Sequence, residues 1–74
     1  MRIGLLWYDA DRKKSLEQKI DEALYRYADK FGTRPNACHV NPQQAGAHPR
    51  LRVIPNRLIQ PDHFWLGEEE QKQY

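Results

Sequence analysis

One apolar stripe and four short apolar runs divide the chain into a helix and four strands. Within residues 16–31 most apolar positions recur every three or four residues, which places them on one side of an α-helix. The stripe consists of Leu16, Ile20, Ala23, Leu24, Tyr27 and Phe31. Ser15 followed by Gln18 fits a capping box at the start of this helix, with Asp11 as an alternative start one turn earlier. Gly32 stands where a left-handed C-cap is expected, so the helix is predicted to end there.

The predicted strands are short and lie between turn-forming residues. They cover residues 3–8, 37–40, 51–54 and 63–66. The order β-α-β-β-β predicts an α+β two-layer fold, a small mixed sheet with one amphipathic helix on one face. The helix is long enough for a right-handed crossover, so the strands on either side of it are expected to run parallel. The last two strands are close enough in sequence to pair antiparallel.

Length and composition indicate one small domain without an internal covalent link. The 74 residues are expected to form a compact domain over 1–67, followed by an acidic, flexible tail over 68–74. A chain of this size buries only about 60% of its unfolded surface, so it usually needs a disulfide, a metal or a second subunit. Cys38 is the single cysteine, which excludes an internal disulfide and favours a reducing, cytoplasmic setting.

No part of the sequence predicts a leader peptide or a membrane span. The apolar run that begins at Ile3 ends at Tyr8, which is too short for a signal peptide. No stretch approaches the roughly 20 apolar residues of a transmembrane helix. The protein is therefore expected to be cytoplasmic and to have no membrane partner.

The net charge of +2 conceals a basic body and an acidic tail. Residues 68–74 contain three Glu and one Lys, a charge of −2, so the rest of the chain carries +4. A mildly basic body is compatible with nucleic-acid binding, but solvated surfaces often have the same balance. Charge therefore leaves the class of partner open.

The residue types that carry catalysis or bind metals form no recognisable motif here. The potential metal ligands are Asp9, Cys38, His39, His48, Asp62 and His63, and no pair of them has the spacing of a zinc site. Cys38 lies within a predicted strand, where a thiol usually packs as a small apolar side chain. Asp9 and Asp11 precede the helix and are interpreted as capping residues, and nothing in the sequence pairs Asp9 with Asp62. The chain is therefore predicted not to be an enzyme and to have no catalytic residue, metal or cofactor.

The predicted sheet has two faces, and a single helix can cover only one of them. Adjacent residues of a strand point to opposite faces, so Trp65 cannot face the same way as Phe64 and Leu66. Whichever set meets the helix, the other keeps an aromatic and several apolar side chains, and such a patch usually marks an interface. We therefore predict a self-associating interaction protein, a homo-oligomer with a dimer favoured. The predicted interface comprises Tyr8, Arg52, Ile54, His63 and Trp65.

Other occupants of this face are also considered. Single-stranded nucleic acid could stack its bases on sheet aromatics beside basic residues. The residues for this alternative are Tyr8, His39, Arg50, Arg52, Arg57 and Trp65. The face could instead be covered by the loop 42–50 and the tail, or by an unknown protein partner. A metal-dependent enzyme is the third candidate function, and it lacks a ligand motif.

Overall fold

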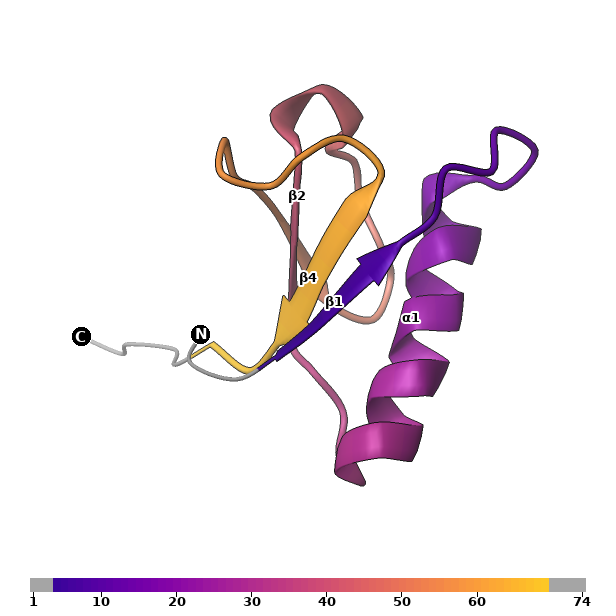
Figure 1. Ribbon diagram of the computed structural model, residues 1–74. Helices are drawn as coiled ribbons and strands as arrows, with labels where there is room; N and C mark the ends of the chain where they lie inside the picture. Colours follow the sequence, from indigo (N-terminus) through magenta and orange to yellow (C-terminus); the bar gives the residue numbers. More distant parts are fainter. Residues whose placement is uncertain (1–3, 70–74) are drawn as a thin grey trace.

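The computed structural model describes residues 4–69, which form one helix packed on a four-stranded mixed sheet (Figure 1). The elements are β1 (Gly4–Tyr8), α1 (Leu16–Phe31), β2 (Ala37–Val40), the 3-10 helix η1 (Pro42–Gln44), β3 (Arg52–Pro55) and β4 (His63–Gly67). The predicted α+β fold with one helix on one face is confirmed. Within residues 4–69, no helix is long and apolar enough to cross a membrane.

The strand order in the sheet is β1-β4-β2-β3. β4 lies between β1 and β2 and is antiparallel to both, whereas β2 and β3 are parallel neighbours. The predicted antiparallel pairing of the last two strands is therefore wrong. β1 and β2 do run in the same direction, as expected, but β4 separates them.

The residues of β3 and β4 explain this order. Phe64 and Leu66 of β4 are almost fully buried, and Trp65 between them is half-buried on the opposite face, which suits a central strand. β3 ends in Pro55, which has no N–H to donate to a further strand and is therefore compatible with the edge of a sheet. The segment 56–62 is long enough to carry the chain from this edge to the middle of the sheet.

The helix begins and ends at the predicted residues. The Ser15 side chain accepts from the Gln18 N–H, and the Gln18 side chain accepts from the Ser15 N–H, so the capping box is complete. The alternative start at Asp11 is wrong, because the Asp11 carboxylate accepts from the N–H of Lys13 and closes a turn instead. Gly32 ends the helix with φ at +70°, in the left-handed region that favours glycine.

The core lies between α1 and the face of the sheet that it covers. Its buried members are Ile20, Ala23, Tyr27, Cys38, Val40, Phe64 and Leu66. Leu24 and Phe31, which belong to the predicted stripe, pack against this cluster and are half-buried. α1 contacts mainly β1 and β4, and Figure 1 shows it along one side of the sheet.

The loop 42–50 packs on the helix side of the molecule, so the prediction that it could cover the other face of the sheet is wrong. Its first part is held by Gln44, whose side chain binds both the N–H and the carboxylate of Asp62. Its second part passes over α1, where Gly46 lies against Leu16 and His48 binds Asp21. The loop thus belongs to the helix layer, and in the described part of the chain it does not cover the opposite face of the sheet.

Candidate functional site

The face of the sheet opposite α1 carries a continuous group of aromatic, apolar and polar side chains. The strand register aligns Leu6 with Trp65, Trp65 with His39, and His39 with Ile54, and it aligns Tyr8 with His63. We call this surface the open face, and it comprises Leu6, Tyr8, His39, Arg52, Ile54, His63 and Trp65. No helix or strand formed by residues 4–69 packs on it (Figure 1).

The most exposed part of the open face lies on the edge strand β1. Leu6 is 55% exposed and Tyr8 is 61% exposed, although both belong to residue types that normally bury much of their surface. The ring of Tyr8 packs beside that of His63, with centroids 4.9 Å apart and an angle of 50° between the planes. The indole of Trp65 lies next to Gly4, where an added Cβ would be 3.0 Å from the ring. Glycine at this position thus lets the indole lie close to β1.

His39 forms a polar centre within the open face. The Asn56 side-chain oxygen accepts from the N–H of Leu58, so its amide nitrogen faces His39 Nδ1 at 3.1 Å and donates to it. Nδ1 is then an acceptor, and the ring proton lies on Nε2, which donates to the Glu69 carboxylate at 2.5 Å. The hydrogen bond from His39 lowers the pKa of Glu69 below its ordinary value. The two residues therefore form an ordered polar pair surrounded by apolar neighbours.

The start of the acidic tail is attached to the fold. The side chain of Asn36 accepts from the Glu69 N–H at 2.7 Å and donates to the Glu69 carbonyl at 2.9 Å. Thr33 also donates to the carboxylate of Glu68 at 3.4 Å. The prediction of a flexible tail over 68–74 otherwise falls on residues 70–74, which lie outside the described residues.

The five residues predicted for a protein interface share one face of the sheet. They are Tyr8, Arg52, Ile54, His63 and Trp65, and the strand register places all of them on the side opposite α1. The six residues predicted for nucleic-acid binding do not all lie on one face. The open face contains four of them, which are Tyr8, His39, Arg52 and Trp65. Arg50 lies on the helix side, where its guanidinium binds Asp21. Arg57 is in the turn after β3.

The residues considered for catalysis are engaged in structural contacts. Cys38 is fully buried in the core, and burial raises the pKa of its thiol to about 12.

Asp9 takes part in a turn. Its carboxylate accepts from the N–H of Asp11 at 2.9 Å and pairs with Lys14 at 3.3 Å, and the hydrogen bond from Asp11 contributes most to the lowering of the Asp9 pKa. The backbones of Asp9 and Asp62 are joined by a hydrogen bond of 2.9 Å, but the Asp62 carboxylate is bound by Gln44. Asp9 thus stabilises a turn rather than capping the helix itself.

The three histidines lie in three separate environments. His39 binds Glu69, His48 binds Asp21, and His63 Nδ1 lies 2.9 Å from the carbonyl of Pro61. Within residues 4–69, no group of three His, Cys, Asp or Glu side chains is placed to hold a metal ion. The absence of metal from the protein itself stays a prediction.

Sequence reasoning missed the polar residues that organise the open face. Asn36 and Asn56 lie outside every predicted strand and Glu69 lies in the predicted tail, yet these residues fix the ring of His39 or the start of the tail. Asn36 and Glu69 are separated by 33 positions, and neither belongs to a local pattern that could indicate this contact.

Similarity to other proteins does not contribute to a functional assignment. No family model matches the chain, and neither a curated protein nor a solved structure shows a significant match to it. The open face is therefore the feature on which a proposal about function depends.

Proposed function

We propose that this protein is a small self-associating interaction module and that a second copy of the chain covers its open face. The observation that carries the proposal is the exposure of Leu6 and Tyr8 beside Trp65 and Ile54, on a sheet face against which no helix or strand of residues 4–69 packs. An aromatic side chain buried at a contact removes about 150–250 Å² from water. At about 25 cal/mol per Å², several such side chains add a substantial favourable free energy of association.

A contact with twofold symmetry suits this surface, because the same face carries a positive and a negative side chain. From the described residues, Arg52 contributes a guanidinium to the open face, and the carboxylate of Glu69 lies nearby at His39. In a symmetric dimer each copy presents both groups to the other, so charges of opposite sign can pair around an apolar centre. The contact would also supply the stabilisation that a 74-residue chain with one cysteine lacks.

The nucleic-acid alternative receives less support from the same contacts. Phosphate binding requires several cations along one surface, whereas Arg50 lies on the other layer of the fold, away from the open face. The His39 ring, which could stack a base, donates to a carboxylate that would repel phosphate. A non-enzymatic role forms part of the proposal, because neither Cys38 nor Asp9 is placed as a reactive group. A cytoplasmic location also forms part of it, because a single cysteine favours a reducing compartment.

Matched substitutions on the two layers test the proposal. Tyr8 and Tyr25 are both exposed, at 61% and 73%, but Tyr8 lies on the open face and Tyr25 on α1. Tyr8→Glu should shift the protein from dimer to monomer in analytical ultracentrifugation, because a carboxylate would have to be desolvated at the contact. Tyr25→Glu should leave the dimer intact. Loss of the dimer in both variants, or in neither, would contradict the assignment of the open face.

A further inference from the structure

A groove on the helix layer combines two arginines with an apolar floor. Its volume is about 360 Å³, near the lower end of the roughly 300–1,000 Å³ typical of small-molecule sites. It is lined by Asp21, Leu24, Tyr25, Ala28, Arg34, Pro35 and Arg50. We call it the arginine groove. It lies on the side of the molecule opposite the open face, so it stays accessible when a second copy covers the sheet.

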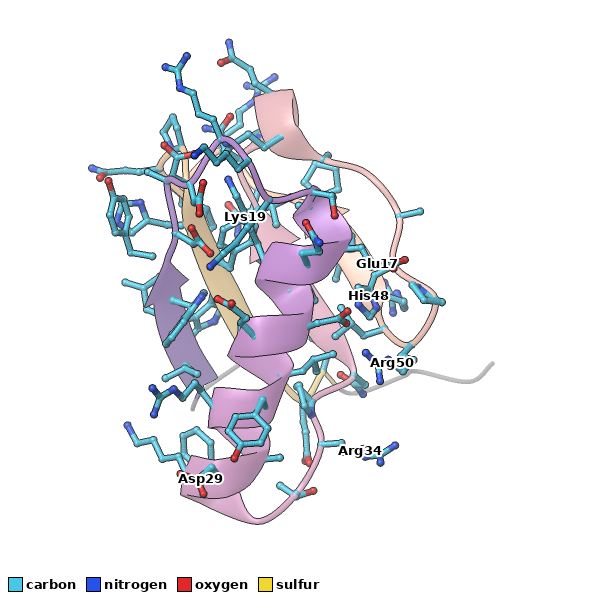
Figure 2. All side chains as sticks on the ribbon, turned by 90° about the vertical axis from the view of Figure 1, so that its right-hand side faces the viewer. Glu17, Lys19, Asp29, Arg34, His48 and Arg50 are labelled. Carbon is cyan, nitrogen blue, oxygen red and sulfur yellow. The ribbon has the colours of Figure 1, made fainter. Side chains whose placement is uncertain are left out.

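The topology brings the two arginines together. β2 and β3 are parallel neighbours, so the segments that lead into them arrive at the same end of the sheet. Arg34 precedes β2 and Arg50 precedes β3, and both face the same side of α1. Figure 2, which looks onto α1, shows Arg34, Arg50 and His48 beside this side of the helix.

Arg50 is held in position by two other side chains. Its backbone N–H donates to His48 Nδ1 at 3.1 Å, so the proton of this buried ring lies on Nε2, which donates to Asp21 at 2.8 Å. The same Asp21 oxygen accepts from the Arg50 guanidinium. Among the described residues this is the hydrogen bond that the guanidinium makes, and because a guanidinium has five N–H donors, further donors can bind a ligand.

Arg34 supplies the excess positive charge. Its side chain is exposed, and within residues 4–69 it takes part in no ion pair. Pro35 restricts the backbone of Arg34 to extended conformations, which limits the directions in which the guanidinium can point. Since Asp21 balances only one of the two arginines, the lining carries a net charge of +1 and favours an anion.

The remaining lining favours a flat apolar body beside that anion. Asp21, Leu24, Tyr25 and Ala28 recur at helical spacing, so they form one face of α1. Leu24, Ala28 and Pro35 provide an apolar floor, and the Tyr25 ring is 73% exposed at the groove. Exposed aromatic rings and guanidinium planes are the surfaces on which flat aromatic rings stack.

We propose that the arginine groove binds a small ligand that joins an anionic group to a flat aromatic ring, such as a nucleoside monophosphate. The anionic group lies between Arg34 and Arg50, and the ring lies over the apolar floor beside Tyr25. This site is independent of the proposed self-association, because the two surfaces belong to different layers of the fold.

Titration of the full-length protein followed by NMR tests the proposal, with AMP, adenosine and inorganic phosphate as separate probes. AMP should bind saturably and more tightly than either fragment, and it should shift the signals of Tyr25 and of residues 34 and 50. Arg34→Gln should weaken AMP binding at least tenfold, and Tyr25→Ala should weaken it several-fold. Arg12→Gln removes a comparable exposed charge in another part of the chain and should leave the affinity unchanged.

Three results would overturn the proposal. The first is the absence of saturable AMP binding, and the second is wild-type affinity in Arg34→Gln. The third is AMP binding no tighter than that of inorganic phosphate, which would show that the aromatic part of the ligand makes no contact. Arg34 and Tyr25 are exposed, so circular dichroism should show both variants to be folded and a loss of binding can be assigned to the groove.

Discussion

The reactivity of Cys38 depends on the face of the sheet to which β2 directs its thiol. Cys38 lies opposite Leu66 in the sheet and points towards α1, whereas the next residue, His39, points to the open face. One position along β2 thus separates a fully buried thiol from an imidazole that takes part in the candidate interface. The sequence interpretation of Cys38 as a packed apolar residue agrees with this burial.

The Cys38 thiol should be unreactive in the native protein. Burial raises its pKa to about 12 from an ordinary value of 9.0, so almost no thiolate is present at pH 8. Ellman's reagent should label Cys38 only as fast as the protein unfolds, and fully in denaturant. Rapid labelling of folded protein would contradict the burial of this residue.

The same shift predicts a loss of stability at alkaline pH. The raised pKa means that the native thiol keeps its proton between about pH 9 and 12, while the unfolded thiol loses it. The contribution to stability is therefore complete below pH 9 and is lost as the pH rises towards 12. Denaturant melts at pH 8 and pH 10.5 should show a larger decrease for the wild type than for Cys38→Ala, and equal decreases would contradict the shift.

Asp9 should contribute to stability in the opposite pH range. Its pKa is lowered, chiefly by the hydrogen bond from the Asp11 N–H and further by Lys14, so the native state binds fewer protons than the unfolded state around pH 3.8. This stabilisation is present above that pH and is lost as the pH falls through the lowered value. Asp9→Asn should reduce the difference in unfolding free energy between pH 7 and pH 3. Asp29→Asn, which removes an exposed carboxylate of α1 outside this turn, serves as the control (Figure 2), and a reduction of the same size in both variants would contradict the role of Asp9.

At the level of elements, the helix could be predicted closely from sequence, and the sheet order could not. The signals for α1 are local, because its stripe, its capping box and Gly32 all lie within residues 15–32. The order of the strands depends instead on which short strand fits between two others. Pro55 in β3 and the two-sided apolar pattern of β4 are compatible with the observed order, but neither feature specifies which strands become neighbours.

For the candidate site too, the features that depend on local sequence could be predicted, and those that depend on contacts between distant residues could not. The alternation within each strand was sufficient to group Tyr8, Ile54 and Trp65, because period two assigns the faces once the register is known. The contact of His39 with Glu69 spans 30 positions and depends on the path of the chain after β4. The position of Arg50 on the helix layer likewise depends on its contacts with Asp21 and His48. No local sequence pattern connects Arg50 to Asp21.

The C-cap of α1 offers a test of this element. Gly32 has φ at +70°, and an added Cβ would meet no atom within 4 Å, so the cost of a substitution comes from the backbone alone. Gly32→Ala should lower the free energy of unfolding by about 1 kcal/mol, because a residue with a Cβ is strained in the left-handed region. Gly32→Asn should cost less, since asparagine tolerates this conformation. If the wild type, Gly32→Ala and Gly32→Asn were equally stable in chemical denaturation, residue 32 would not have the left-handed backbone conformation of a C-cap.

At the scale of the whole molecule, the described residues form a sheet with two faces and one α-helix, which covers only one of these faces. The covered face is closed by α1 and by the loop 42–50, and the other presents Leu6, Tyr8 and Trp65 to its surroundings. Soluble monomers rarely leave a contiguous apolar patch of this kind without a partner. The proposed self-association through the open face and the proposed ligand binding in the arginine groove involve opposite layers, so one does not exclude the other.

The solution mass of the protein tests the central claim most directly. Sedimentation equilibrium at tens of micromolar should give twice the 8.8 kDa mass of the chain, because the proposed dimer buries two open faces against each other. The melting temperature should also rise with protein concentration, as mass action requires for a folded dimer. A mass of 8.8 kDa at the same concentration, with a melting temperature independent of concentration, would contradict the proposed self-association.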